Sequence, residues 1–479
     1  MPQPKLYRLL ERLDGRELPW LDKFLASPFF SSSPWPQSLW ECLRDAHPRY
    51  EALSKEQVFG RLCPGQPFDG KFLNDRYSEL SRLVEAFFFQ QAFRREESLQ
   101  RRARRAAYRR RGLYPLFSKE CHRQASYLLG QPYRSPGNLA EALEIFDAHY
   151  IHPESKSHAD EGAETSQVME QLDLHFVLLK LKYACDQLAR RLSFNEPLDE
   201  RFLEAVLEEA PHLEERHPAI GLYYRLARLF IEGCPDESFQ QTKQLFYDLG
   251  ELLPAAEQSF VLAKFVALAY MRFNRNQERG LGEVYELFQY GEKHRLFIFD
   301  GVISDATFLN VCTIAAQTGD FDWARQFIQK NEAFLPEAAK PDAVILGRAT
   351  VAFAQEDYSG AYHQLNEVYK RQSAYKLRVR SLYVRCLLGM HLAELRHEAP
   401  LHSALEAFGQ YIRRHPNLSK GRKDAYLNFA KAVKKIALLR SQAWHSSRAR
   451  AATLEWLNQL QPIILGAWLR KQLERTDLR

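Results

Sequence analysis

The chain has 479 residues, with 46% apolar and 26% charged side chains and a net charge of +6 at pH 7. That length excludes a single compact core, unless the chain is an elongated array in which each unit buries its face on the next. The seven cysteines are scattered and form no C-x-x-C pair, which argues against a disulfide framework or a zinc site and favours buried free thiols in a reducing compartment.

The N-terminus mixes acidic and basic residues among leucines and has none of the features of a signal peptide. The most apolar stretch, residues 260–271, contains Lys264 and is too short to cross a bilayer. We therefore expect a cytoplasmic protein with no membrane contact.

Residues 1–92 are expected to form an N-terminal helical domain. Leucines at positions 6, 9, 10 and 13 repeat at helical spacing, and Ser54 has the position of an N-cap before a helix over residues 55–62. The Pro-Gly stretch at residues 63–67 ends that helix, and Asp69 is expected to cap a longer one.

The segment over residues 54–89 has a helix–turn–helix pattern, with polar side chains on its second helix at Asn74, Arg76 and Arg82. It resembles the winged-helix domains that precede helical repeats in some bacterial transcription regulators, and the resemblance implies DNA reading. Two features oppose that interpretation. No β-hairpin pattern follows the second helix, and carboxylates that would repel phosphates lie beside the polar residues at Asp75, Glu79 and Glu85.

Residues 93–151 are expected to form a basic helical segment. Between Arg94 and Arg111 there are nine arginines and only two glutamates, so the arginines cannot all pair with their neighbours. Such charge attracts phosphates or acidic protein surfaces. The candidate polyanion-binding residues here are Arg101, Arg102, Arg104, Arg105, Arg109, Arg110 and Arg111.

Residues 152–167 carry Pro, Ser, Gly, Asp and Glu without a large apolar residue and are expected to be a linker. A metal site is an alternative, because three histidines and two aspartates lie nearby at His149, His152, His158, Asp147 and Asp160. Their spacing fits no defined ligand pattern, so we expect no metal.

Residues 168–479 are expected to form seven helical hairpins. Their first helices should begin near Leu172, Ala219, Ala256, Ile303, Asp342, Tyr375 and Gly421. Spacings of about 35 to 47 residues fit tetratricopeptide-like units with variable loops. Strand patterns are nearly absent. Residues 296–299 are one short strand candidate, but they are expected to end a helix before Asp300-Gly301.

The clearest support for these repeats is a segment that occurs twice, at residues 315–324 and 352–361. The matched pairs are Asp320 with Asp357, Phe321 with Tyr358, Ala324 with Ala361, and Ile328 with Leu365. Alanine allows close helix contact, the aromatic residue fills the gap toward the next unit, and aspartate can cap the second helix. The pattern predicts an all-α fold, a tetratricopeptide-like right-handed α-solenoid with an N-terminal helical domain. Trp323 is interpreted as a packing residue.

A second basic region lies between residues 413 and 450, with eleven Lys or Arg and one acidic residue, Asp424. The candidate polyanion-binding residues here are Arg422, Lys423, Lys431, Lys434 and Lys435. The last three share one helix face at i, i+3 and i+4. The alternative is a solubilising surface, or charge that pairs with an acidic stretch such as residues 204–215.

No nucleophile elbow, phosphate-binding glycine loop, dinucleotide motif or H-E-x-x-H motif occurs in the chain. The carboxylates lie on expected helix faces beside lysines and arginines, where solvated ion pairing is the ordinary role. We therefore expect no enzyme activity, and no catalytic, cofactor-binding or metal-binding residues.

The whole chain also resembles a family of bacterial tetratricopeptide-like helical-repeat proteins. The resemblance is carried by residues 24–30, 111–114, 181–185, 320–323 and 428–429. It implies the repeat fold and brings no activity. Most units lack the Trp and Gly-x-x-Tyr of the tetratricopeptide consensus, so peptide binding on the inner surface does not follow from it.

These observations favour a non-enzymatic scaffold or adaptor whose partner is another protein. The alternative is a nucleic-acid-binding regulator that uses the basic helices and the helix–turn–helix-like segment. A third possibility is an enzyme whose site is assembled across repeats.

Overall fold

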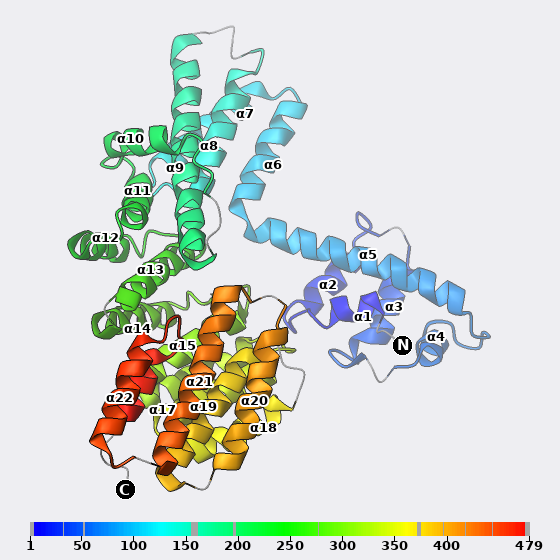
Figure 1. The fold of residues 1–479 in the computed structure, drawn as a ribbon. Coiled ribbons are helices and arrows are strands. Elements are labelled where there is room, and N and C mark those ends of the chain that lie inside the picture. Colours follow the sequence, from blue (N-terminus) through cyan, green and yellow to red (C-terminus); the bar gives the residue numbers. More distant parts are fainter. Residues whose placement is uncertain are drawn as a thin grey trace. The chain divides into compact units, whose positions relative to one another are not determined.

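The computed structural model describes residues 4–31, 33–50, 53–154, 161–194, 198–275, 277–370, 375–395, 397–416, 418–442 and 444–474. Helix accounts for 77% of the structure, in 23 α-helices, and almost no strand is present among the described residues (Figure 1). The all-α class is therefore confirmed. No helix within these ranges is long and apolar enough to span a bilayer.

The chain forms two compact units. Unit 1 comprises Met1–Gly130 and Ala142–Val168, and unit 2 comprises Gln131–Glu141 and Met169–Arg479. The helices up to the unit boundaries are α1 (Lys5–Leu10), α2 (Leu18–Leu25), α3 (Trp35–Arg44), α4 (Lys55–Leu62), α5 (Gly70–Arg95), α6 (Glu97–Arg110), α7 (Tyr114–Leu129), α8 (Pro136–Tyr150) and α9 (Glu161–Phe194). The unit boundaries fall within α8 and α9.

In unit 1, the long helix α5 packs against α1, α2, α3 and α4 around a buried core that includes Trp40 and Phe87. Asp69 caps α5, as predicted, because its carboxylate accepts the backbone N–H groups of Lys71 and Phe72 at 2.9 and 3.0 Å. Ser54 caps α4 through a capping box. A second, smaller core joins α7 and α8.

The boundaries expected from the sequence differ from those of the structure. The expected domain end near residue 92 falls inside α5, and residues on both sides of it belong to unit 1. The expected linker over residues 152–167 is shorter, because α9 begins at Glu161. Residues 155–160, which include His158 and Asp160, lie outside the described part of the chain.

Unit 2 continues as a succession of helix pairs. Its remaining helices are α10 (Leu203–Leu213), α11 (Pro218–Ile231), α12 (Asp236–Asp248), α13 (Ala255–Arg275), α14 (Gln277–Lys293), α15 (Asp305–Thr318), α16 (Phe321–Asn331), α17 (Lys340–Ala354), α18 (Tyr358–Tyr369), α19 (Lys376–Glu394), α20 (Glu398–Arg414), α21 (Lys420–Gln442), α22 (Ser447–Gln459) and α23 (Gly466–Glu474). A 3₁₀ turn, η3, covers Glu332–Phe334. Six of the seven predicted first helices begin within two residues of the expected position; α9 begins well before the expected Leu172.

The two matched segments have the packing roles predicted for them. Asp320 caps α16 by accepting the N–H of Trp323 at 3.1 Å, and Asp357 caps α18 by accepting the N–H of Gly360 at 2.8 Å. Ala324 and Ala361 are fully buried. Each aspartate therefore begins the second helix of its pair, and each alanine lies where that helix contacts its neighbours.

Tyr358 fills the space toward the next pair, as expected. A Cβ atom built on Gly389 of α19 would lie 2.6 Å from the ring of Tyr358, so only glycine lets the ring lie this close to that helix. Trp323 stacks on Phe327, with ring centroids 5.6 Å apart, and meets Tyr285 edge-on at 5.3 Å. Its interpretation as a packing residue is confirmed.

Residues 296–299 do not end a helix, so the favoured prediction was wrong, and the strand alternative holds for the last two of them. Ile298–Phe299 forms strand β1, which pairs antiparallel with β2 (Val302–Ile303). Asp300 and Gly301 have φ of 49° and 79°, as a tight hairpin turn requires. Helix α14 ends earlier, at Lys293, and the Asp-Gly pair forms only the turn of the hairpin.

All seven cysteines are free, and six of them are buried. Burial raises the pKa of Cys121 to about 11, which keeps that thiol protonated and unreactive. The prediction of buried free thiols is confirmed for all but Cys42, which is partly exposed.

Candidate functional site

The arginines in the first half of α6 form ion pairs. Arg101 pairs with Glu97 at 3.1 Å and lies over the ring of Tyr127, while Arg102 pairs with Glu144 of α8 at 3.0 Å. Three carboxylates, from α6, α7 and α8, pair with the four arginines at positions 101, 102, 104 and 105, so each of these arginines has a partner within unit 1.

Arg104 and Arg105 belong to a network that reaches into the interior of unit 1. Arg104 pairs with Glu120 of α7 at 3.3 Å. Arg105 is only 4% exposed, pairs with Glu144 at 3.5 Å and donates to the side chain of Gln124. Hydrogen bonds from Arg123, followed by those from Gln124, lower the pKa of Glu120 below its ordinary value. Arg105 is therefore buried and paired, and it cannot bind a polyanion at the surface as the sequence predicted.

The arginines at the C-terminal end of α6 lie in a different environment from those of its first half. Arg109, Arg110 and Arg111 are exposed, and no ion pair to any of them is present among the described residues. Arg111 donates to the carbonyl of Ala107 at 3.4 Å. Positive side chains at a helix C-terminus are favoured by the helix dipole, which gives these residues a structural role as well.

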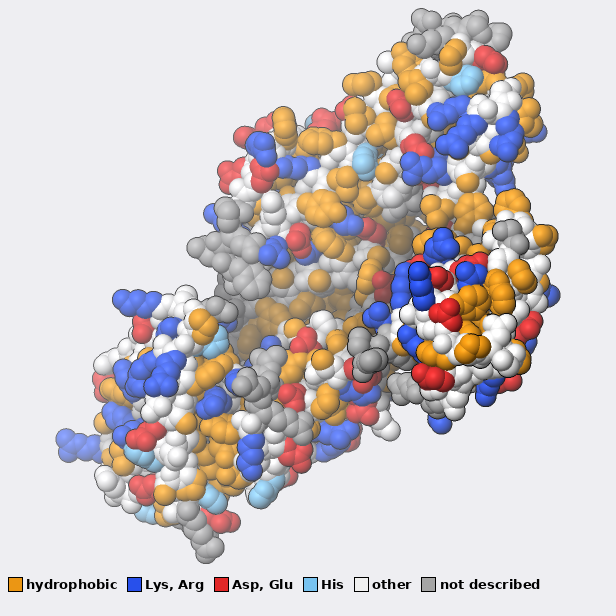
Figure 2. Space-filling model, turned by 90° about the vertical axis from the view of Figure 1, so that its right-hand side faces the viewer, with side chains coloured by type: hydrophobic (Ala, Val, Ile, Leu, Met, Phe, Trp, Pro, Cys, Tyr) orange, Lys and Arg blue, Asp and Glu red, His pale blue; other side chains and the backbone are white. Residues whose placement is uncertain are grey.

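The basic residues of α21 also divide into two kinds. Lys435 lies 4.0 Å from the ring centroid of Trp456, and Lys423 donates to the carbonyl of Arg413 at 3.3 Å. Lys431 is exposed and donates to Asn428 at 3.3 Å. Arg422 and Lys434 are exposed and have no ion pair within the described ranges. On the face shown in Figure 2, Lys and Arg side chains alternate with acidic and apolar ones.

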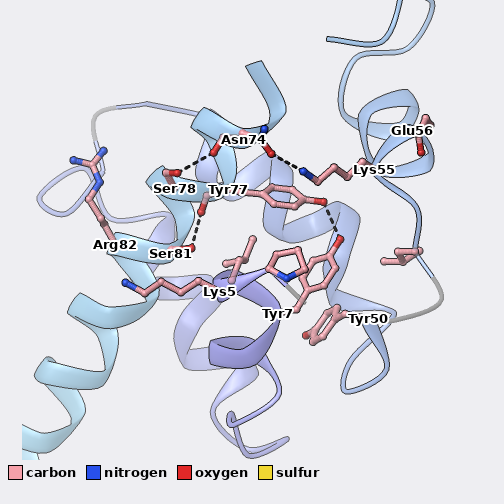
Figure 3. Close-up of a pocket in the computed structure, with 13 residues that line it drawn as sticks. Lys5, Tyr7, Tyr50, Lys55, Glu56, Asn74, Tyr77, Ser78, Ser81 and Arg82 are labelled. Carbon is pink, nitrogen blue, oxygen red and sulfur yellow. Dashed lines mark hydrogen bonds between the residues drawn. The ribbon is translucent and has the colours of Figure 1, made fainter. Parts of the chain in front are cut away.

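A hollow of about 1050 Å³ opens in unit 1 between α1, α4 and α5, and Figure 3 shows its lining. Three tyrosines meet at its floor: the hydroxyls of Tyr7 and Tyr77 are 2.8 Å apart, and the rings of Tyr7 and Tyr50 stack at 5.3 Å. Burial raises the pKa of Tyr7 and Tyr77, so both phenols stay neutral and can act only as hydrogen-bond partners.

The polar rim of this hollow is largely paired. Lys55 donates to Asn74 at 2.7 Å, and Lys5 pairs with Glu85 at 2.8 Å. Asn74 and Arg76, candidates for DNA reading, therefore have local roles, since Arg76 pairs with Glu79 at 2.9 Å. The connection between α4 and α5 spans residues 63–69, longer than the three or four residues of a helix–turn–helix.

A partly buried arginine of unit 2, Arg385, has no partner of opposite charge among the described residues. The guanidinium of Arg385 on α19 lies 4.7 Å from the ring centroid of Phe353 on α17 and 5.9 Å from that of Trp468 on α23. Its Nε is buried without a hydrogen-bond partner, and no ion pair to it exists among the described residues. Burial lowers its pKa to about 10, and the charged form persists at neutral pH.

The C-terminal segment brings Trp468 to this position by turning back over α21. The side chain of Asn428 donates to the carbonyl of Pro462 at 3.0 Å, and the N–H of Ile464 donates to the carbonyl of Ala425 at 3.5 Å. Helix α23 then packs on α21, with Leu469 and Leu473 buried in the core that α19, α20 and α21 share. Sequence reasoning missed this site, because Phe353, Arg385 and Trp468 lie far apart in the chain.

The histidine candidates behave as packing groups. His149 stacks on Tyr114 and shares a 2.9 Å hydrogen bond with the hydroxyl of Ser118, while His152 stacks on Tyr114 at 4.6 Å. Ser118 lies within α7, whose backbone N–H groups are committed to the helix, so the Ser–His pair has no oxyanion-binding donors beside it. Among the described residues, no group of three His, Cys, Asp or Glu side chains could hold a metal ion.

No family model, curated protein or solved structure matches the chain. Arguments about its function therefore rest on its own residues.

Proposed function

We propose that this protein is a non-enzymatic interaction scaffold, in which unit 2 is a tetratricopeptide-like right-handed α-solenoid that binds an acidic segment of another protein. The order of the helices supports the solenoid. From α15 onward each first helix contacts the second helix of its own pair and the first helix of the next pair. The two aspartate caps and the two buried alanines recur at the same period.

The observation that carries the binding proposal is the unpaired guanidinium of Arg385. Arg385 is partly buried, and a charge withdrawn from water without a counter-ion costs free energy. A carboxylate from a partner would both neutralise this charge and accept hydrogen bonds from the guanidinium. The ring of Trp468, which is partly exposed, offers apolar contact beside that charge, while the ring of Phe353 is buried beneath it. An acidic segment with an apolar residue next to its carboxylate fits both features.

The test is a fluorescence-anisotropy titration with two labelled helical peptides that share their apolar residues. One peptide carries Glu and the other Gln at the polar positions. We expect the Glu peptide to bind the wild-type chain about tenfold more tightly, since a charged hydrogen-bonded pair is worth about that factor. Arg385→Gln should abolish the preference. Arg348→Gln, on the exposed side of α17, is the matched control and should retain it.

Two results would contradict the proposal: equal affinity for the two peptides, or a preference for Glu that Arg385→Gln leaves unchanged.

Nucleic-acid binding is the second candidate function. The observation that favours it is the exposed, unpaired end of α6 at Arg109, Arg110 and Arg111.

A further inference from the structure

A small cavity lies at the N-terminus of α11 in unit 2, far along the chain from Arg385. Its volume is about 40 Å³, and it is lined by residues that precede α8, by α9 and by the start of α11. One water occupies about 10–15 Å³ measured in this way, so the cavity has the size of a few waters or of one tetrahedral oxyanion. Leu139 and Leu178, both buried, close its apolar side.

A buried imidazole in this cavity lacks a hydrogen-bond partner. His217, only 8% exposed, is the residue that precedes α11, and its Nδ1 is buried without a partner. Its main-chain carbonyl is used within the fold, since it accepts the N–H groups of Ile220 and Gly221 at 2.9 and 3.2 Å. A buried polar atom that the protein leaves unpaired costs free energy, and a ligand that pairs with it would recover that cost.

Positive charge surrounds this imidazole from two sides. Arg134, from the segment before α8, and Arg216, immediately before His217, both line the cavity, and neither forms an ion pair within the described ranges. Burial, followed by the charges of these two arginines, lowers the pKa of His217 to about 4.

The helix itself adds to this field. Helix α11 is 14 residues long and begins with Pro218, so the N–H of Ala219 is among those that have no acceptor within the helix. The aligned peptide dipoles place partial positive charge at the same end, and helix N-termini of this kind bind phosphate and sulfate.

From these observations we infer that the cavity at His217 is a binding site for a phosphate group, held by Arg134, Arg216, His217 and the N-terminus of α11. The site is separate from the surface around Arg385, and the inference does not depend on the scaffold proposal. The cavity accommodates the phosphate group and little more, so the rest of a phosphate ester would lie outside it.

The test is isothermal titration of the full chain at neutral pH and constant low ionic strength, with inorganic phosphate and with phosphoserine as separate probes. We expect one site per chain. Arg216→Gln and Arg134→Gln should each weaken binding about tenfold or more, because each removes charge-assisted hydrogen bonds to the anion. Arg216 is exposed, so its substitution should leave the fold intact. Arg228 of α11 pairs with Glu232 and lies outside the cavity lining, so Arg228→Gln is the matched control and should bind as the wild type does.

Proton NMR of His217 provides a second readout, since a bound anion should raise the pKa of the imidazole. Binding of both probes, or of phosphoserine alone, identifies a phosphate carried on another molecule; binding of inorganic phosphate alone identifies the free anion. No heat with either probe and no shift of the His217 resonance would overturn the inference. Binding that survives Arg134→Gln and Arg216→Gln would do the same.

Discussion

Arg105 in unit 1 is buried and Arg385 in unit 2 is partly buried, and the two arginines have different surroundings. Arg105 meets Glu144 and Gln124, supplied by α8 and α7, whereas Arg385 meets only the rings of Phe353 and Trp468. The first lies in the most basic stretch of the chain and the second outside both basic stretches. The density of positive charge along a sequence is therefore a poor guide to where a counter-ion is missing.

The largest effect should come from Arg105→Ala. Removing one member of a buried charged network leaves its partners unpaired, and we expect a loss of about 3 kcal/mol in the free energy of unfolding, measured in urea. Arg110→Ala, on the exposed end of the same helix, should stay within about 0.5 kcal/mol of the wild type. If Arg105→Ala lost as little free energy of unfolding as Arg110→Ala, Arg105 would not be part of a structural network.

A second effect should come from His217, which faces Arg134 and Arg216. Its folded pKa of about 4 lies below the unfolded value of about 6.5, so the unfolded chain binds the proton first as the pH falls. The contribution of neutral His217 to the free energy of unfolding should therefore be fully present above about pH 6.5. It should decrease below that pH, by at most about 2 kcal/mol near pH 5.

Urea unfolding at these two pH values, in wild type and Arg216→Gln, measures this effect. Arg216→Gln removes one of the charges that lower the pKa of His217, so its stability should depend less on pH. An unchanged dependence would show that the arginine does not act on the imidazole.

Arg385→Met should change the free energy of unfolding only slightly, and in the direction opposite to Arg105→Ala. Methionine has a similar length and needs no counter-ion, so we expect the free energy of unfolding to rise by about 1 kcal/mol or to stay unchanged. A loss as large as that of Arg105→Ala would show that Arg385 has a structural partner, and the contrast between the two arginines would disappear.

The smallest effect concerns the affinity for nucleic acid. Labelled DNA and RNA are titrated at two salt concentrations against two triple variants. Replacing Arg109, Arg110 and Arg111 by Gln should reduce the slope of log affinity against log salt by at most about 3, since each lost phosphate contact changes it by about 0.9. Replacing the paired Arg101, Arg102 and Arg104 should leave the slope within about 1 of the wild type. If the wild type binds neither nucleic acid at low salt, this candidate function is excluded.

Features set by local chemistry could be predicted from the sequence. The caps at Ser54, Asp69, Asp320 and Asp357 depend on residues three positions apart, and helical periodicity fixes most of the helix starts. The strand before Asp300-Gly301 was only the second alternative, although its turn signal is local, because two-residue strands leave too few positions to show alternation.

Features set by distant contacts could not be predicted. Arg104 pairs with Glu120 and Arg102 with Glu144, on two later helices, so the charge balance of the arginine run depends on the packing of α6 against α7 and α8. The same holds for Arg385, whose setting depends on a tryptophan near the end of the chain, and for His217, whose cavity is completed by residues before α8.

Because the C-terminal segment returns over α21, one part of unit 2 can complete its folding only late in synthesis. Phe353 leaves the ribosome well before Trp468, and synthesis at about 5–20 residues per second separates the two by roughly ten seconds. During that interval α17 and α19 can form, but the ring of Phe353 lacks its cover and remains open to other nascent chains or to chaperones. The closing step of folding in this unit therefore waits for the synthesis of α23.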